Sequence, residues 1–371
     1  MRVSAAVIEE VDAPFTFADV DLDDPRDHEI VVRIVATGLC HTDLSARGGV
    51  TPFPLPAVLG HEGAGVVERV GPKVSTVTVG DHVLISFTSC GHCRACQEGN
   101  PVYCQDWVPL NLLGGSRLDG SATVTRKEGP ALHGHFFGQS SFATRALVTE
   151  FAAVKVPHDL DLSTLAPLGC SVQTGVGAVL NVARPEPGST LVVFGVGGVG
   201  LAAIMGAVLT PAAQIVAVDV KASRLALAAE LGATHTIDSS STDPAEAIAE
   251  VTGGAGADYA LETSGRLDVL GTAVSVLSSA GTCVVIGAPA LGSTLPLDVT
   301  NLLGRGIRLL GSNQGNSNPA RFLPQLIALH REGRLPFDRL IRTYPFAEIN
   351  TAVADAISGK TVKPVLLMPQ D

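Results

Sequence analysis

Hydrophobic and polar positions divide the chain into two contrasting regions. In the first hundred residues, Val-rich segments at 30–38 and 65–71 are interrupted by Gly and Pro and lack helical periodicity, which is typical of β-strands. After about residue 170, continuous apolar runs alternate with helical segments rich in small residues. This alternation predicts a parallel sheet covered by helices on both faces. Residues 191–200 contain a predicted strand, a Gly turn and the start of a helix that continues to about residue 209. A second helix is predicted at 223–232. Further strands are predicted at 215–220, 234–238, 257–265, 281–289 and 307–313.

Two further segments do not fit the parallel series. Residues 105–141 show little regular pattern, and loops of this length in compact domains are usually functional or packed around something else. Near the end, the pattern predicts a helix at 320–333 and a strand at 362–368. Because this strand has no partner in the parallel series, we expect the C-terminal segment to return to the first domain.

Length and composition narrow the class of protein. A chain of 371 residues with 46% hydrophobic types suggests two domains rather than one. The 25 Lys and Arg against 36 Asp and Glu give a net charge of −11, and without a basic cluster this argues against nucleic-acid or anionic-membrane partners. There is no apolar run of membrane-spanning length, and acidic residues occupy the start where a signal peptide would be apolar. We therefore expect a soluble, unexported, cytoplasmic protein.

Four of the seven cysteines are clustered. Two-residue gaps separate Cys90, Cys93 and Cys96, and Cys104 follows after a longer gap. This spacing predicts a tetrahedral Cys₄ zinc site, which is closed to substrate and orders its loop. Iron–sulfur ligation also uses clustered cysteines, although the intervening polar residues mildly disfavour it. An odd number of cysteines in an unexported protein fits a disulfide framework poorly.

The remaining cysteines lie far apart, and His61 stands near one of them. Cys40, His61 and Cys170 have the composition of a Cys₂His catalytic zinc site with one open position. Spacing alone does not assemble them, because a lone buried Cys or His is usually a packing residue. Cys283 lies inside a predicted strand and is interpreted as a core residue.

A glycine motif follows the first strand of the parallel series. In GVGGVG (195–200), Gly195, Gly197 and Gly200 stand between a strand and a helix, as a dinucleotide-binding turn requires, and Gly198 is part of the same turn. The helix N-terminus would receive the pyrophosphate. Asp219 follows 19 residues after Gly200 at the end of a strand, where its carboxylate would bind the adenosine ribose and repel a 2′-phosphate. This predicts NAD rather than NADP, the alternative being that Asp219 is a turn residue.

Motifs along the whole chain resemble the zinc-dependent medium-chain alcohol dehydrogenases. The resemblance covers about residues 5 to 368, and the matching motifs are GLCHTD, GHEGAGVVERVG, the four-cysteine loop, PLGC and GVGGVG. LPAVLGHEGAGVVE, HGHFFGQSSFATRAL, APLGCSVQTG and LPFDRLI are similar to the aryl-alcohol (benzyl-alcohol) branch. The resemblance implies an α/β protein in which a β-rich GroES-like catalytic domain (1–171 and 315–371) surrounds a doubly wound Rossmann cofactor domain (172–314).

The resemblance also implies roles for individual residues. It makes Cys40, His61 and Cys170 ligands of a catalytic zinc. It places Glu62 behind the metal, as an outer carboxylate or a transient ligand, and Asp43 where it orients His61, as outer carboxylates do in many zinc sites. It implies that the Thr42 hydroxyl contacts the substrate oxygen, although Thr42 in isolation could be a turn or cap residue. The position that ends the proton relay in well-known relatives carries Ser45 instead of His, so the proton would leave through water or another base.

Other implied residues would contact the cofactor or the substrate. The resemblance implies Lys363 and His41 near the pyrophosphate and Arg224 near the ribose. A contact from a mostly neutral His41 would be weaker and pH-sensitive. The alternative for Lys363 and Arg224 is that each is a solvated surface charge. Phe87 matches a position that lines the substrate channel, and residues 107–113 could add another wall, with ordinary packing as the alternative for both.

The implied reaction is reversible oxidation of a primary alcohol, aryl or allylic, to its aldehyde with hydride transfer to NAD. It would use two zinc ions per chain. Two alternatives on the same scaffold are a thiol-adduct formaldehyde dehydrogenase and a general alkanol dehydrogenase. A noncatalytic NAD-binding zinc protein is the alternative from another class. Relatives are dimers or tetramers, and the expected exposed sheet edge at about 300–313 also favours a homo-oligomer.

Overall fold

The computed structural model describes residues 1–369, which form two compact units. The first comprises Met1–Cys170, Asn318–Ala328 and the segment from Asp338 onward, and the second comprises Ser171–Ser317 and Leu329–Phe337. The predicted boundaries at 171/172 and 314/315 differ from these by a few residues. Residues 329–337, which the sequence interpretation assigned to the C-terminal part of the catalytic domain, group with the second unit. This segment contains the end of α10 (Pro319–Arg331) and most of the connection that leads to β16 (Ile341–Pro345).

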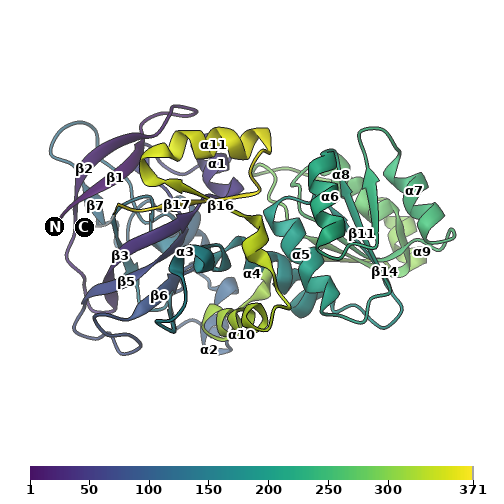
Figure 1. The fold of residues 1–371 in the computed structure, drawn as a ribbon, viewed down its shortest axis with the longest axis horizontal. Coiled ribbons are helices and arrows are strands. Elements are labelled where there is room, and N and C mark those ends of the chain that lie inside the picture. The colour runs from purple at the N-terminus through teal and green to yellow at the C-terminus, as the bar shows by residue number, and fades with distance from the viewer. Residues whose placement is uncertain (370–371) are drawn as a thin grey trace. The chain divides into compact units, whose positions relative to one another are not determined.

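The first unit is built on two sheets (Figure 1). The strand order in the larger is β16-β17-β3-β5-β6-β9, with β8 also paired to β3, and in the smaller it is β4-β1-β2-β7. The predicted strands at 30–38 and 65–71 correspond to β3 (Glu29–Gly38) and β5 (Glu62–Val70). The remaining strands are β1 (Arg2–Ile8), β2 (Thr16–Leu22), β4 (Ala57–Val58), β6 (His82–Ile85), β7 (Val124–Thr125), β8 (Arg145–Thr149) and β9 (Ala153–Val156).

The C-terminal segment joins this first unit, as predicted. β17 (Lys363–Leu367) pairs antiparallel with β3, and β16 pairs parallel with β17 on its other side. Helix α11 (Ile349–Ser358) packs along both strands (Figure 1). Most apolar side chains of β3 and the Val67 side chain of β5 are buried in one core with Phe136, Phe142 and Tyr344. The register of β3 and β17 places Lys363 near the end of β3, where the chain leads into Cys40.

The second unit contains the predicted parallel sheet. Its order is β12-β11-β10-β13-β14-β15, and every pair in it is parallel. The strands are β10 (Thr190–Phe194), β11 (Gln214–Asp219), β12 (His235–Asp238), β13 (Ala257–Glu262), β14 (Leu277–Val285) and β15 (Arg308–Gly311). Helices α6 (Ala222–Glu230) and α8 (Leu267–Ser275) lie alongside β11 and β14 (Figure 1). This order is that of a doubly wound dinucleotide-binding sheet.

Most of the irregular stretch at 105–141 is loop, as expected, with short helical turns at 109–113 and 136–138. The expected edge at 300–313 is correct only in part, because 299–305 are helical and only β15 forms the edge strand. The remaining helices are α1 (His41–Arg47), α2 (Arg94–Gln97), α3 (Leu162–Leu165), α4 (Ser171–Gly177), α5 (Gly198–Val208), α7 (Pro244–Val251) and α9 (Val299–Arg305). Shorter or wider helical turns are η1 (Pro101–Tyr103), η2 (Pro109–Leu113), η3 (Phe136–Gly138), η4 (Ala166–Gly169), η5 (Ala178–Ala183), η6 (Gln314–Asn316), η7 (Phe337–Leu340) and η8 (Phe346–Glu348).

Within residues 1–369, no single helix has the length and apolarity needed to cross a membrane. The two helical segments Leu162–Gly169 and Ser171–Ala183, which are bent relative to each other, have that length and apolarity only when they are counted together.

Candidate active site and structural metal site

The clustered cysteines converge as their spacing predicts. The Sγ atoms of Cys90, Cys93, Cys96 and Cys104 all lie within 4.8 Å of one another. Backbone N–H groups point at two of these sulfurs: Cys90 N donates to Cys104 Sγ at 3.3 Å, and Cys93 N donates to Cys90 Sγ at 3.3 Å. Four sulfurs in this arrangement fit a closed tetrahedral metal site with no position left for a substrate. None of the cysteines within residues 1–369 forms a disulfide.

The second group of metal-ligating side chains comes from three distant segments. Cys40 lies at the start of α1, His61 and Glu62 where the chain enters β5, and Cys170 directly after η4. One ligand atom from each lies within 4.8 Å of the others, and all four residues are buried. The fold therefore brings together residues that spacing alone could not. Two thiols and one imidazole around one point fit zinc, whose bonds to S and N are about 2.0–2.3 Å long.

His61 is oriented as a metal ligand. Asp43 Oδ1 accepts from His61 Nδ1 at 2.9 Å and from Gly60 N at 3.1 Å, and Asp43 Oδ2 accepts from Cys40 N at 2.9 Å. One carboxylate therefore holds both the ring of one ligand and the backbone of another. Within the described residues, His61 Nε2 is buried and has no hydrogen-bond partner. Because buried polar atoms are nearly always paired, this free nitrogen fits a metal ion beside the two thiols.

Electrostatics within the group favour charged forms of two ligands. Burial opposes charge on His61, but the Asp43 carboxylate outweighs it and raises the pKa of the ring to about 10. A metal ion must therefore displace a proton from Nε2. The pKa of the Cys40 thiol lies well below its usual value because of the hydrogen bond from Cys170, with the positive charges of Lys363 and His61 also contributing. The paired Cys170 thiol has a raised pKa, since it shares its proton with Cys40.

Glu62, the fourth member of this group, is held in place by Lys363. Lys363 Nζ donates to both carboxylate oxygens of Glu62 at 3.0 Å and to the Leu39 carbonyl at 3.2 Å. Lys363 is only 3% exposed, so the surface-charge interpretation of this residue is wrong. Burial is the main cause of the raised pKa of Glu62. Gly38 makes room for the pair, because a Cβ there would lie 1.9 Å from Glu62 Oε2.

The glycine motif forms a tight turn between β10 and α5, as predicted. Gly195 has a φ of 82°, and its N–H donates to the Val218 carbonyl at 2.8 Å. A Cβ at Gly200 would lie 2.0 Å from the Gly195 carbonyl, so a side chain is excluded there. At Gly197 the nearest atom to a Cβ would be Arg224 Nη1, 4.0 Å away. The turn therefore leaves its outer side open while packing its inner side closely, as close approach by a pyrophosphate requires.

Asp219 lies at the end of β11 beside this turn. Its Oδ2 accepts from Val196 N at 2.8 Å and its Oδ1 from Lys221 N at 2.9 Å, so the carboxylate is fixed next to the glycines. Arg224 Nη1 lies 3.9 Å from Asp219 Oδ2, close to Gly197. A carboxylate offers about four acceptor positions, so Asp219 retains capacity for a ribose hydroxyl.

Aromatic rings surround the His61 side of the metal group. The Phe137 ring stacks on the His61 imidazole, with centroids 4.5 Å apart and planes at 25°, and Phe136 meets the imidazole edge-on at 5.5 Å. Trp107 contacts Phe137 at 5.9 Å, and Phe87 lies 6.4 Å from Trp107. Phe87, the predicted channel residue, is thus linked to the metal group through two other rings. These four rings form one buried aromatic cluster beside the metal group.

The remaining predicted residues occupy expected elements. Thr42 and Ser45 lie three residues apart on α1, where neighbouring side chains share a face, and His41 is exposed at its first position. Thr42 Oγ1 lies 3.8 Å from Cys40 Sγ, which places the hydroxyl beside a metal ligand. Cys283 is fully buried in β14, and burial raises its pKa to about 12, as befits a core residue.

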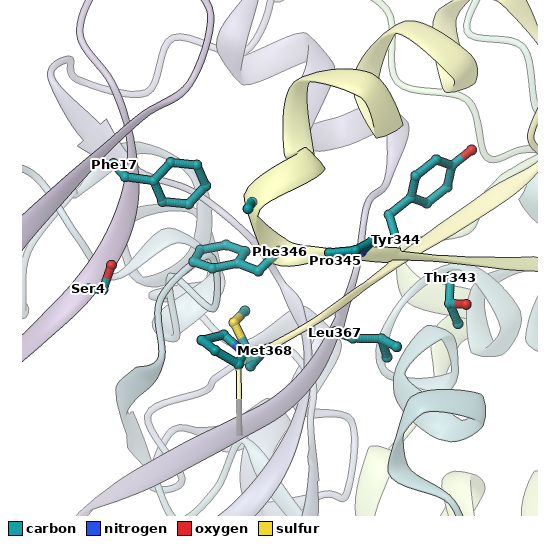
Figure 2. Close-up of a pocket in the computed structure, with 10 residues that line it drawn as sticks. Ser4, Phe17, Thr343, Tyr344, Pro345, Phe346, Leu367 and Met368 are labelled. Atoms are coloured by element: carbon teal, nitrogen blue, oxygen red, sulfur yellow. The ribbon is translucent and has the colours of Figure 1, made fainter. Parts of the chain in front are cut away.

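A separate hollow of about 490 Å³ lies on the first unit (Figure 2). Its lining is largely apolar and includes Phe17, Phe346, Leu367 and Met368. The hydroxyl of Tyr344 points away from the hollow and binds Asp355 at 2.8 Å. Because the lining offers neither a metal ligand nor a carboxylate, the candidate chemistry lies at the metal group instead.

Together, a dinucleotide turn on a doubly wound sheet and a Cys₂His group beside buried carboxylates define a zinc-dependent dehydrogenase. Residues 26–158 match the alcohol dehydrogenase GroES-like domain, and residues 198–330 match the zinc-binding dehydrogenase family. Over 368 residues the chain is 43% identical to a geraniol dehydrogenase of Castellaniella defragrans, covering 99% of this chain and 98% of that protein.

Two solved structures cover the chain completely and are themselves fully covered. One is an alcohol dehydrogenase zinc-binding domain protein from Burkholderia ambifaria, with a TM-score of 0.95 and 50% identity. The other is the benzyl alcohol dehydrogenase of Acinetobacter calcoaceticus, with a TM-score of 0.95 and 42% identity. The chain belongs to the zinc-dependent medium-chain alcohol dehydrogenase family. It is an alcohol dehydrogenase, and zinc and a nicotinamide cofactor belong to its chemistry.

Sequence reasoning missed several residues of the site. Phe136 and Phe137 were noticed only as part of a family motif, although two adjacent rings stand out in a chain with 4% aromatic residues. Gln139, whose side chain binds the backbone at His61, carried no signal of its own. The ion pair between Lys363 and Glu62 joins positions at opposite ends of the chain, which no local pattern could reveal.

Proposed function

We propose that this chain catalyses the reversible oxidation of primary aryl or allylic alcohols to aldehydes, with NAD as the hydride acceptor. The observation that carries this proposal is the series of aromatic contacts from His61 through Phe137 to Trp107 and Phe87. Such rings favour substrates whose reacting carbon adjoins a flat π-system. The names of the geraniol and benzyl alcohol dehydrogenases, one allylic and one aryl, support the same class.

The proposed catalytic zinc site is Cys40, His61 and Cys170, and the proposed structural zinc site is the four-cysteine loop. A zinc ion in the first site supplies Lewis-acid chemistry that lowers the pKa of an alcohol hydroxyl. Asp43 keeps Nε2 of His61 free for the metal by holding Nδ1. Glu62, fixed by Lys363, is the proposed outer carboxylate of this site or a transient fourth ligand.

Thr42 is the proposed contact of the substrate hydroxyl. Its Oγ1 lies beside Cys40 and at the start of α1, so it can accept a hydrogen bond from an oxygen held next to the thiol ligands while passing its own proton onward. Ser45 lies one turn further along the same face, in the position where relatives place the end of a relay. The hydroxyl of Ser45 is too weak a base to end the relay, so the proton leaves through water or another base.

NAD is the proposed cofactor because Asp219 is fixed beside the glycine turn. The GVGGVG turn and the N-terminus of α5 are the proposed pyrophosphate site, with His41, Lys363 and Arg224 as further proposed contacts. A carboxylate at the ribose disfavours a 2′-phosphate. Asp219→Ala should therefore reduce the preference for NAD over NADP, measured as the ratio of kcat/KM values. An unchanged ratio would contradict the proposed role.

Metal content and a substrate panel test the whole proposal. The purified protein should contain two zinc ions per chain and should reduce NAD, followed at 340 nm, with benzyl alcohol and geraniol in preference to ethanol. Preference for ethanol would indicate a general alkanol dehydrogenase, and preference for a thiol–formaldehyde adduct would indicate a formaldehyde dehydrogenase. One zinc and no turnover with any of the four would indicate a noncatalytic binding protein.

We also propose that the chain forms a homo-oligomer through the edge of its second unit. β15 is the last strand of the parallel sheet, and all four of its residues are exposed. Val299 and Leu303, on the adjacent α9, are 71% and 80% exposed, and Leu309 and Leu310 on β15 are also exposed. An exposed strand edge with apolar neighbours is typical of a pairing surface, and a second copy would cover both. Light scattering after size-exclusion chromatography would detect the oligomer, and a monomer would contradict this proposal.

A further inference from the structure

The turn formed by residues 135–140 lies near the end of the irregular stretch 105–141 and packs against the segment that carries His61. His135, Phe137 and Ser140 adopt φ values of 69°, 51° and 51°, and Gly138 adopts 67°. Three residues other than glycine in the left-handed region within six positions is rare, because the side chain crowds the backbone there. A left-handed conformation of residues other than glycine is stable only where the surrounding structure enforces it. Such residues are frequent at functional sites.

Hydrogen bonds tie this turn to the segment at 58–61. Ser140 Oγ donates to the Val58 carbonyl at 2.6 Å and accepts from Phe136 N at 2.9 Å. Immediately after the turn, Ser141 N donates to the Gly60 carbonyl at 3.0 Å. The turn and the His61 segment therefore form one buried, cross-linked piece of structure.

Three side chains of the turn reach His61: the Phe136 and Phe137 rings contact its imidazole, and the Gln139 amide contacts its backbone. The Phe137 ring covers one face of the imidazole. Gln139 Nε2 donates to the His61 carbonyl at 2.9 Å and to the Ser86 carbonyl at 3.1 Å, while Gln139 Oε1 accepts from Gly63 N at 3.1 Å. These three hydrogen bonds of the Gln139 amide are all made with backbone groups, and Gln139 is only 2% exposed.

The left-handed backbone explains how Phe137 and Gln139, two positions apart, contact the same histidine. Gly138 separates Phe137 from Gln139, and a Cβ at Gly138 would lie 2.5 Å from the Thr88 side chain. The chain must therefore turn sharply at a glycine in order to direct a ring to the imidazole and an amide to the backbone. Asp43 supplies the remaining contact, at Nδ1.

We propose that the 135–140 turn is a positioning element for the metal ligand His61. Phe137 fixes the plane of its ring and Gln139 fixes its backbone. Phe137 and Gln139 act through His61 and are positioning residues, independent of which alcohol is the substrate. The inference rests on the proposed zinc site at Cys40, His61 and Cys170. It predicts that loosening the turn speeds zinc loss from that site and leaves the four-cysteine loop unaffected.

Zinc release into a chromogenic chelator tests this inference without any assay of turnover. The wild-type protein should release its two zinc ions in two phases, and Cys40→Ser, which retains only the four-cysteine site, identifies the phase of that site. Phe137→Leu should speed the other phase by about 10-fold, the lower end of the loss in metal affinity seen when outer partners of a ligand are removed. Phe137→Tyr keeps the stacked ring and should restore the slow release.

The matched control for the ring is Phe346→Leu. Phe346 is a buried phenylalanine of the same unit that packs on Phe17 at 5.1 Å and, within residues 1–369, makes no ring contact with His61. If Phe346→Leu speeds zinc release as much as Phe137→Leu, or if Phe137→Leu releases zinc at the wild-type rate, the inference is overturned. A thermal unfolding scan of each variant identifies any that fail to fold.

A second pair of variants tests the backbone contact independently. Gln139→Glu keeps the acceptor for Gly63 and removes the donor to His61, so it should also speed release from the catalytic site. Asn111→Asp is its control, because the buried Asn111 amide likewise accepts from one backbone N–H and donates to two carbonyls, those of Thr88 and Trp107. Equal release from both variants would overturn the role of Gln139. Wild-type protein that holds zinc only at the four-cysteine loop would overturn the proposed function and this inference together.

Discussion

Replacing Lys363 by Met would break the buried ion pair beside the proposed catalytic ligands. Methionine has a similar length but carries no charge, so Glu62 would keep its buried position and lose both bonds from the ammonium, each of 3.0 Å. Breaking one partner of a buried pair costs about 3–5 kcal/mol, because the other charge stays uncompensated. Against a total folding stability of about 5–15 kcal/mol, this loss is large.

A double-mutant cycle separates the pair from general damage. Glu62→Gln alone leaves the ammonium buried, so it should also destabilise by about 3–5 kcal/mol. The double variant leaves neither charge of the pair buried without its partner. Its loss of folding stability should therefore be smaller than the sum of the two single losses by about 2 kcal/mol or more. A simple lack of space at position 363 would instead give additive losses.

Urea unfolding provides the assay for this cycle. The chain contains one tryptophan, Trp107, which is buried in the first unit, so its fluorescence reports unfolding of the unit that contains the pair. Each variant is compared at matched zinc content. A loss below about 0.5 kcal/mol for Lys363→Met, or additive losses in the cycle, would refute the argument. The KM for NAD of the same variant tests the separate expectation that Lys363 contacts the pyrophosphate.

Other parts of the structure lead to three further predictions. Thr42→Ala should lower kcat with benzyl alcohol by orders of magnitude while Ser45→Ala changes it little, and a near-normal rate for Thr42→Ala would exclude its proposed role. Burial lowers the pKa of His135 to about 4, so the unfolded chain binds a proton between about pH 6.5 and 4 that the folded chain does not. The folding stability should thus decrease as the pH falls through this window, by about 2 kcal/mol at pH 5. In the variant His135→Asn, whose asparagine tolerates the same φ, urea unfolding should no longer show this pH dependence. Leu303→Glu should shift the oligomer toward monomer in light scattering, and an unchanged mass would locate the interface elsewhere.

Features set by short-range chemistry could be predicted from the sequence. The four-cysteine loop and the glycine turn each need particular residues at fixed short spacings, so their geometry follows from the local pattern. Continuous apolar strands alternating with helices likewise predicted the parallel sheet, and the unpartnered strand near the C-terminus returned to the first unit as expected.

Features that depend on long-range packing could not be predicted from the sequence. Cys40, His61 and Cys170 meet only because β3, β5 and the η4 segment pack together, so the family resemblance had to supply what spacing could not. The helix α9 within the expected sheet edge was missed because a short apolar run does not distinguish strand from helix. The stacking of Phe137 depends on left-handed backbone that side-chain patterns do not encode.

The most direct test of the central claim compares zinc content and turnover in three proteins. Wild-type protein should hold two zinc ions per chain and produce NADH from benzyl alcohol. His61→Ala should hold one zinc and produce none, yet remain folded, because the four-cysteine loop is intact. Asn181→Ala removes an amide of the second unit that donates to the Gly315 carbonyl at 2.9 Å, and this control should keep both zinc ions and most of the activity. Two zinc ions in His61→Ala, or undiminished NADH production by that variant, would contradict the account.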